Sequence, residues 1–248
     1  MTLAALYDIH ANLPALEAVL REIRLAGVDR IVVGGDVVPG PMPRETIACL
    51  LARDLRVRVL QGNGDREVLA LMRGGDGAAV PEPFRESVRW TARQLGADEE
   101  RLLAGWPPTL HLPIDGLGDT VFCHATPRND TEIFTRRTPE ERLRPMFDPL
   151  NVPLVVCGHT HMQFDRTIGR TRVVNAGSVG MPFQEPGAYW LLLGPGVQLR
   201  HTRYDLEEAA ARIRATGYPQ AEQFAARHVL RPPSEQEMLD AFTRVEGR

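Results

Sequence analysis

The sequence predicts an α/β fold with parallel strands, on the evidence of two patterns. In the first third of the chain, short apolar runs of strand length alternate three times with longer amphipathic segments of helix length. This alternation is typical of parallel strands joined by crossover helices, whose ligand sites lie just beyond the carboxyl ends of the strands. Later in the chain, β-type runs follow one another with short turns between them, which predicts a second, partly antiparallel sheet.

The elements of the first third are separated by clear stop signals. Asp8 follows the first apolar run, Gly34 and Gly62 follow the second and the third, and Gly27 ends the first amphipathic segment. The predicted strands span residues 3–7, 31–33 and 57–60, and the predicted helices span residues 13–23, 43–54 and a segment that begins after Asp65.

The middle of the chain continues with both kinds of element. Residues 81–106 have a helical pattern, 120–123 and 153–157 are apolar and strand-like, and 138–147 are predicted to form a helix. The β-type runs then cover residues 166–174, 188–193 and 197–204, with a turn at Gly169.

The tail beyond residue 204 is predicted to be helical. Asp205 can cap one helix, Gly217 and Pro219 separate it from a second, and Ser234 with Glu237 makes a capping box for a third. Its apolar positions suit packing either on the core or on a second subunit, so a homo-oligomer formed through these helices is one expectation. We predict a single domain over residues 1–248, in which 205–248 is a C-terminal helical extension.

Charge and composition exclude several classes of protein. The 29 basic and 32 acidic residues give a net charge of −3, which provides no electrostatic footprint for nucleic acid or an anionic membrane. All 29 basic residues are arginines, so a P-loop lysine, a Schiff-base lysine and a lysine general base are excluded. No segment approaches the ~20 apolar residues that a membrane-spanning helix needs.

The three cysteines favour a reducing compartment. Cys49, Cys123 and Cys157 lie in apolar runs, and no pair has C-x-x-C spacing, so buried thiols explain them better than disulfides. The N-terminus also lacks the pattern of a signal peptide. We therefore expect a cytoplasmic protein.

Polar side chains of metal-ligand type recur where the predicted strands end. Taken one at a time, an aspartate after a strand can cap a helix, Gly-Asn-Gly can form a turn, and a lone histidine needs no special role. Taken together they predict a metal site, because the carboxyl ends of the strands bring them to one edge. The candidate ligands are Asp8, His10, Asp36, Asn63, His124, His159 and His161.

These residues stand in motifs that resemble a known family. The ordered motifs are Asp8-Ile9-His10, Gly35-Asp36, Gly62-Asn63-Gly64-Asp65, His124 and Gly158-His159-Thr160-His161. In this order they resemble the five motifs of the calcineurin-like metallophosphoesterases. Gly40-Pro41 and the segment from Asn175 to Gly180 are similar to the small prokaryotic phosphodiesterase-like branch, and the resemblance runs from Asp8 to about Gly180.

The resemblance implies a four-layer α/β/β/α sandwich with two divalent metal ions at one rim, about 3.5–4 Å apart. It implies that one ion is held by Asp8, His10 and His161, the other by Asn63, His124 and His159, and that Asp36 bridges them. Manganese is the first expectation, with iron, nickel or zinc as alternatives. A water shared by the ions would lose a proton and attack phosphorus, which makes Asp36, Asn63 and His124 the catalytic candidates.

The third motif departs from the family pattern. Gly64 stands where the family usually has a histidine that donates a proton to the leaving group or stabilises the phosphoryl group, and Asp65, which would orient it, can instead cap the following helix. Arg128 and Arg66 are candidates for the missing positive charge and for substrate binding, with surface salt bridges as the alternative for both.

The function that the resemblance implies is the hydrolysis of a small phosphoester, more specifically of a phosphodiester. Two alternatives stay open. One is a non-catalytic metal-binding scaffold of the same fold, which the glycine at position 64 favours. The other is a protein phosphatase or a dinucleoside polyphosphate hydrolase, although those relatives normally keep the histidine of the third motif.

Overall fold

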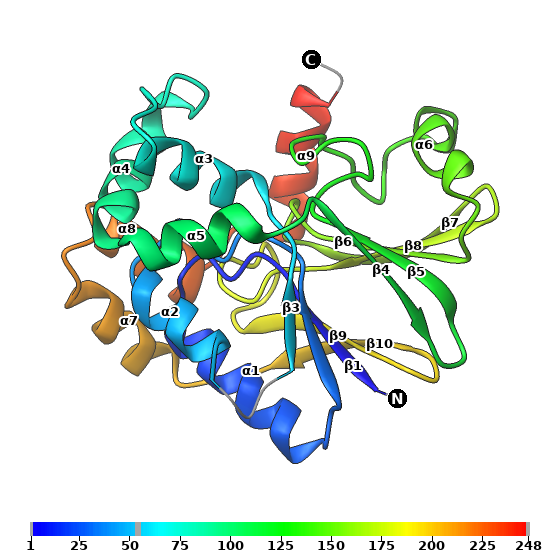
Figure 1. Cartoon of the computed structure of the whole chain (residues 1–248), viewed down its shortest axis with the longest axis horizontal. Helices are drawn as coiled ribbons and strands as arrows, with labels where there is room; N and C mark the ends of the chain where they lie inside the picture. Colours follow the sequence, from blue (N-terminus) through cyan, green and yellow to red (C-terminus); the bar gives the residue numbers. More distant parts are fainter. Residues whose placement is uncertain (1, 53–55, 247–248) are drawn as a thin grey trace.

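Two five-stranded sheets lie face to face with helices on the outer side of each, in a computed structural model that describes residues 2–52 and 56–246 (Figure 1). Apolar residues from both sheets form the central core, for example Leu3 and Leu191 from the first sheet and Phe122 and Val156 from the second. The predicted four-layer α/β/β/α sandwich is confirmed.

The first sheet combines the parallel strands predicted for the start of the chain with a later hairpin. Its strand order is β10-β9-β1-β2-β3, with β1 (Leu3–Leu6), β2 (Arg30–Val33), β3 (Val57–Val59), β9 (Ala188–Leu193) and β10 (Val197–Thr202). β1, β2 and β3 are parallel, and Leu6 at the end of β1 pairs with Val33 at the end of β2. The segments that follow these strands therefore start from the same edge of the sheet.

The second sheet has parallel strands at its centre and antiparallel strands at its edges. Its order is β4-β5-β6-β8-β7, with β4 (Thr109–Ile114), β5 (Gly118–Cys123), β6 (Leu154–Cys157), β7 (Gln163–Ile168) and β8 (Thr171–Ala176). The predicted turn at Gly169 joins β7 to β8. β4 was not predicted, because Pro113 interrupts its pattern; a proline is tolerated here because β4 is an edge strand.

Helices cover the outer faces of both sheets. The first sheet is covered by α1 (Leu13–Leu25), α2 (Pro43–Leu50), α3 (Asn63–Met72), α4 (Arg85–Gln94) and α5 (Ala97–Gly105), and the second by α6 (Glu140–Phe147). Short 3-10 turns span Glu82–Phe84 and Asp148–Leu150. The helical pattern over 81–106 is divided between α4 and α5 because Leu95 is extended and Gly96 follows it. The helix predicted over 43–54 ends at Leu50, and its predicted end at residue 54 lies outside the described residues.

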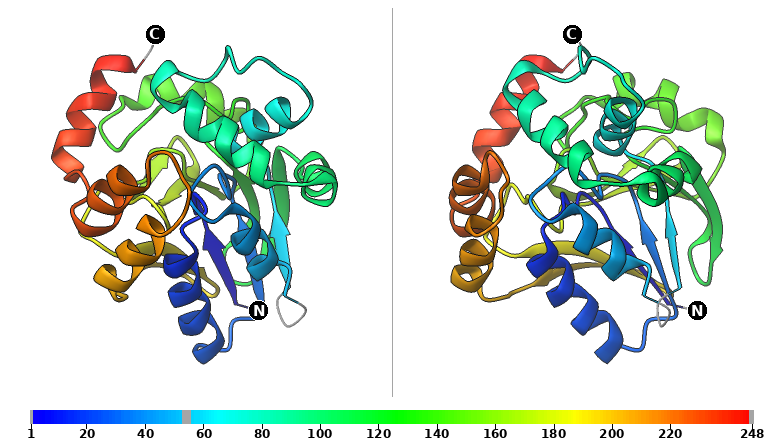
Figure 2. Two further views of the ribbon diagram at one scale, coloured as in Figure 1. Left: turned by 90° about the vertical axis from the view of Figure 1, so that its left-hand side faces the viewer. Right: turned by 60° about the vertical axis from the view of Figure 1, so that its left-hand side comes forward.

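The C-terminal extension runs along one side of the sandwich, seen in Figure 2 as a column of gold to red helices. It consists of α7 (Leu206–Arg214), α8 (Ala221–Phe224), a π-helix η3 (Ala225–Leu230) and α9 (Glu235–Val245). Asp205 caps α7 and Ser234 forms a capping box with Glu237, as predicted. The extension shares a buried apolar cluster with Leu13 and Met42, so it packs against the starts of α1 and α2. Within the described ranges, we find no helix with the length and apolar character needed to cross a bilayer.

Candidate metal centre

All seven side chains predicted as metal ligands meet at one edge of the sandwich. They come from the loops that follow β1, β2, β5 and β6 and from the first residue of α3. The two sheets are joined there by a hydrogen bond from the His159 backbone N–H to Asp8 Oδ2, 2.9 Å long. The convergence that the strand ends predicted is therefore present in the folded chain.

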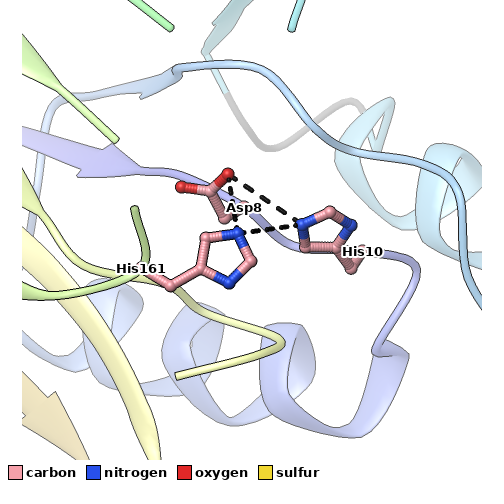
Figure 3. A group of neighbouring side chains, drawn as sticks. All are labelled: Asp8, His10 and His161. Atoms are coloured by element: carbon pink, nitrogen blue, oxygen red, sulfur yellow. Dashed lines mark hydrogen bonds and ion pairs between the residues drawn. The ribbon is translucent and has the colours of Figure 1, made fainter. Parts of the chain in front are cut away.

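The first group consists of Asp8, His10 and His161 (Figure 3). Asp8 Oδ1 lies 3.3 Å from His161 Nε2 and 3.9 Å from His10 Nε2, and the two ring nitrogens are 3.2 Å apart. The three atoms point toward one another, which is the arrangement of ligand atoms around a shared ion.

Asp36 lies between this group and the others. Its Oδ2 is 3.6 Å from His10 Nε2, and its Oδ1 is 3.5 Å from His124 Nε2. Asp8 Oδ1, Asp36 and His124 also form a second set of possible ligand atoms within 4.8 Å of one another. The two oxygens of Asp36 therefore face different sides of the centre.

Asn63, His124 and His159 form the other side. Asn63 Oδ1 lies 3.1 Å from both His124 Nε2 and His159 Nδ1. If the amide were turned by 180°, its NH2 would donate to both rings and no cation would be needed. Only the orientation with the oxygen inward would supply a ligand to a cation held between these groups. In that orientation three acceptor atoms face one another.

Backbone carbonyls behind the rings fix which nitrogen faces inward. His124 Nδ1 lies 2.9 Å from Gly34 O, and His161 Nδ1 lies 2.7 Å from Met181 O. A carbonyl only accepts hydrogen bonds, so these two nitrogens carry protons. In the neutral rings Nε2 then has a free lone pair directed into the centre, as metal ligation requires.

The electrostatics of the centre fit a divalent cation. Asp8 is fully buried, and its Oδ1 has no hydrogen-bond partner among the described residues when the His161 ring is neutral. Burial above all lowers the pKa of His10 and of His159 to about 3, so both rings are neutral at neutral pH. Burial opposes charge on His161 too, but the adjacent Asp8 carboxylate raises the pKa of this ring above its ordinary value, so Asp8 favours positive charge at this position. Nitrogen and oxygen donors without a thiolate suit manganese, iron, nickel or zinc.

The backbone is strained where the ligands stand. Positive φ angles occur at five of the seven candidate ligands: Asp8 (53°), His10 (47°), Asp36 (51°), His159 (67°) and His161 (56°). This left-handed conformation costs roughly 1–2 kcal/mol for each residue with a Cβ. Strain of this kind persists where the surrounding structure fixes side chains for a function.

The first 193 residues of the chain match the Calcineurin-like phosphoesterase superfamily domain. The chain belongs to the calcineurin-like phosphoesterase superfamily. The family that the five ordered motifs predicted is thereby confirmed, and the metallophosphoesterase fold implies divalent metal ions.

Three other proteins are similar over most of the chain. The uncharacterized protein MJ0912 of Methanocaldococcus jannaschii is 28% identical over 201 residues, which are 73% of this chain and 76% of that protein. A metallophosphoesterase from Sphaerobacter thermophilus has a TM-score of 0.69 and 26% identity, and the match covers 91% of this chain and 98% of the other. The hypothetical protein PH1004 from Pyrococcus horikoshii OT3 has the same fold, with a TM-score of 0.78, 22% identity, and coverage of 94% and 99%.

Gly64 is where this member of the superfamily departs from the usual third motif, and the space around it is filled. A Cβ at position 64 would lie 2.7 Å from Pro39 Cδ, 2.8 Å from Val38 O and 3.0 Å from Asp36 Oδ1. The Gly64 backbone N–H also donates to Asp36 Oδ1 at 2.8 Å. Any side chain at position 64 would therefore push against the loop that carries Asp36.

Asp65 caps α3, as the sequence allowed, and it also holds the Asp36 loop. Its buried carboxylate accepts hydrogen bonds from the backbone N–H groups of Asp36 (2.8 Å), Gly62 (3.0 Å) and Val38 (3.0 Å). Burial, reinforced by the charge of Asp36, raises the pKa of Asp65 to about 8. Asp65 is thus a positioning residue that connects the second and third motifs.

We expect Asp65→Asn to lower the free energy of unfolding by about 1–3 kcal/mol, because the new NH2 group would leave one buried N–H donor without an acceptor. Thermal or urea unfolding of the metal-free protein measures this change. Asp205→Asn is the matched control: Asp205 is an exposed cap that accepts one N–H bond from Glu208, and asparagine caps helices equally well. Equal losses in the two variants would contradict the positioning role.

The two arginines proposed for substrate binding are engaged with carboxylates. Arg66 forms two hydrogen bonds to Asp130, of 2.7 and 3.1 Å, and Arg128 forms three to Glu132. The structure therefore displays the surface salt bridges that were the alternative explanation, and the binding role of both arginines stays a prediction.

Several groups that shape the centre could not be read from the sequence. The carbonyls of Gly34 and Met181 act through backbone atoms, which every residue has.

Proposed function

We propose that this chain is a binuclear metal-dependent phosphoesterase that acts preferentially on phosphodiesters. The observation that supports it most directly is the position of Asp36, whose two oxygens face His10 on one side and His124 on the other. A carboxylate placed in this way suits a bridge between two cations. Asp8, His10 and His161 would complete one ligand set, and Asn63, His124 and His159 the other.

Each residue has a task that follows from its chemistry. Two divalent ions held here, with manganese first among manganese, iron, nickel and zinc, would supply Lewis-acid activation of water and of phosphoryl oxygens. Asp8 and Asp36 offset positive charge, while the carbonyl-bound rings of His124 and His161 keep their lone pairs directed inward. The amide oxygen of Asn63 would be an uncharged metal ligand, so it would not repel an anionic substrate.

The preference for a diester rests on charge. A phosphodiester carries one negative charge at neutral pH, whereas a monoester carries up to two. Arg66 and Arg128 are already paired with Asp130 and Glu132, so they add little net positive charge for a dianion. Gly64 also provides no side chain that could stabilise a phosphoryl group, and this likewise favours the diester.

The test compares hydrolysis of a chromogenic diester and the matching monoester by the manganese-loaded chain, with metal sites located by anomalous scattering. We expect two ions at the seven ligands and faster hydrolysis of the diester. A faster monoester would reverse the preference. Two bound ions without turnover of any phosphoester would instead identify a metal-binding scaffold, and absence of bound metal would refute the proposed centre.

A further inference from the structure

Two phenylalanines, Phe183 and Phe242, lie next to the metal centre, and both are partly exposed. The Phe183 ring stacks on the ring of His161, with centroids 4.9 Å apart and an angle of 22° between the planes. Phe242 contacts Phe183 in turn, with centroids 6.2 Å apart. The first ring therefore touches a candidate metal ligand directly, and the second ring enlarges the apolar surface beside it.

Hydrogen bonds of the loop around Phe183 hold its ring against His161. The Phe183 backbone N–H donates to the His161 carbonyl at 3.3 Å, and the Met181 carbonyl accepts from His161 Nδ1 at 2.7 Å. The Ser178 hydroxyl accepts from the Met181 N–H at 2.8 Å and donates to the Asp8 carbonyl at 2.7 Å. The loop is thus tied to two of the candidate ligand residues, and this fixes the Phe183 ring beside the centre.

Contacts with the body of the protein orient the helix that carries Phe242. This helix is α9, which lies beyond the 193 residues that match the superfamily domain and is red in Figures 1 and 2. Arg137, from the segment between β5 and α6, contacts Asp240 and Gln236 of α9, both at 2.7 Å. Asp240 and Gln236 are four positions apart and so lie on one face of the helix. Their contacts with Arg137 therefore fix how α9 is turned.

The exposure of this pair distinguishes it from most other phenylalanines of the chain. Five others are buried in apolar clusters, namely Phe122, Phe134, Phe147, Phe164 and Phe224. Phe183 and Phe242 belong to none of the buried apolar clusters that the described residues form. Apolar side chains that stay partly exposed together, beside a few convergent polar groups, are typical of ligand-binding sites. The pair therefore has the character of a wall of such a site.

We infer that Phe183 and Phe242 bind the aromatic group of a phosphodiester held at the metal centre, an inference that rests on the proposed function. An aryl ester carries its ring one oxygen atom away from phosphorus, so a phosphoryl group held beside His161 allows that ring to reach Phe183. Aromatic rings gain from stacked or edge-to-face contact in addition to burying apolar area, and an alkyl ester gains less. The metal ligands would then bind the phosphoryl group, while the two phenylalanines select the ester.

The experiment measures binding of two probes to the manganese-loaded full chain: the monomethyl esters of phenylphosphonate and of methylphosphonate. Each probe carries one negative charge, as a phosphodiester does, and hydrolysis does not break its C–P bond. Calorimetry gives the two affinities, and their ratio cancels any general loss of phosphoryl binding. We expect the wild-type chain to bind the phenyl probe about tenfold more tightly than the methyl probe.

Two variants remove the aromatic surface in different ways. Phe183→Leu keeps an apolar side chain against His161, and Phe242→Ala removes the ring that contacts Phe183. In each variant we expect the ratio to fall to about threefold or less, with metal content retained. Phe242→Tyr retains a ring and should keep the wild-type ratio. The control is Phe84→Ala, which removes an exposed phenylalanine from the short turn before α4 and should change neither the ratio nor the metal content.

Equal binding of the two probes by the wild-type chain would overturn the inference, and so would a wild-type ratio in both Phe183→Leu and Phe242→Ala. Either result, with both ions bound, would leave the proposed function standing. Loss of metal in Phe183→Leu together with a wild-type ratio in Phe242→Ala would also overturn it, because the pair would then only hold His161 in place. A wild-type chain that binds no metal would refute the proposed function and this inference with it.

Discussion

Asp36→Asn is expected to remove metal binding and hydrolysis while making the metal-free protein more stable. Loss of a residue that only orients a ligand typically costs 10–100-fold in affinity or activity, so loss of the bridging ligand should cost more than about 10²-fold. Asparagine keeps the shape of the side chain and the oxygen that accepts the Gly64 N–H. The variant therefore tests the charge and not the fold.

The opposite effect on stability follows from the burial of Asp36. Burial, and then the charge of Asp8, raise the pKa of Asp36 above its ordinary value of 3.8. The folded metal-free protein therefore holds this proton more tightly than the unfolded chain, and the free energy of unfolding falls as the pH rises past 3.8. A neutral asparagine avoids this penalty, so Tm in the presence of a chelator should rise.

The measurements are metal content after dialysis, kcat/KM for the diester, and Tm with and without chelator. Asp119→Asn, at an exposed position on β5, removes the same charge far from any predicted ligand and should change none of them. An Asp36→Asn protein that retains two ions, or one whose metal-free form is less stable than wild type, would contradict the bridging position of Asp36.

The sequence was sufficient to predict that the candidate ligands converge, because their placement follows from strand direction. Asp8 and Asp36 each follow a buried strand, and parallel pairing in register, Leu6 with Val33, brings these strand ends to one edge. His124 and His159 follow β5 and β6 of the other sheet for the same reason. The ordered motifs added the expectation that the two sheets face each other, which no local pattern contains.

What the sequence could not predict depends on tertiary contacts. A proline in a short run usually argues against a strand, so Pro113 concealed β4. The strand forms because β4 lies at the edge of its sheet, where a proline is tolerated. The Met181 carbonyl orients the His161 ring only because the loop places it there, and the identity of residue 181 does not reveal that position. The apolar face of the tail suited the core and a second subunit equally, so only the folded chain shows that it packs against Leu13 and Met42.

Gly64→His places the residue type that the third motif usually contains into this chain, and we expect it to damage the centre. The new Cβ would lie 2.7 Å from Pro39 Cδ and 2.8 Å from Val38 O, distances that Cβ atoms essentially never adopt. Because Asp65 holds the same loop through the Val38 and Asp36 N–H groups, the loop cannot move away without breaking buried hydrogen bonds. A displacement of about 1 Å at a reacting centre can cost 10²-fold, so we expect kcat/KM to fall by about that factor.

Two further variants separate the added bulk from the added imidazole. Gly64→Ala brings the Cβ without the ring and should cause most of the same loss, with a fall of about 1–3 kcal/mol in the free energy of unfolding from overpacking. Gly105→Ala is the control, because a Cβ at that helical position meets no atom within 4 Å. Higher activity in Gly64→His than in wild type would contradict this prediction. It would show that the Asp36 loop can move to accommodate a side chain, so that lack of space does not explain the glycine at position 64. A loss in both Gly64 variants would show that lack of space, and not the nature of the side chain, keeps position 64 a glycine in this chain.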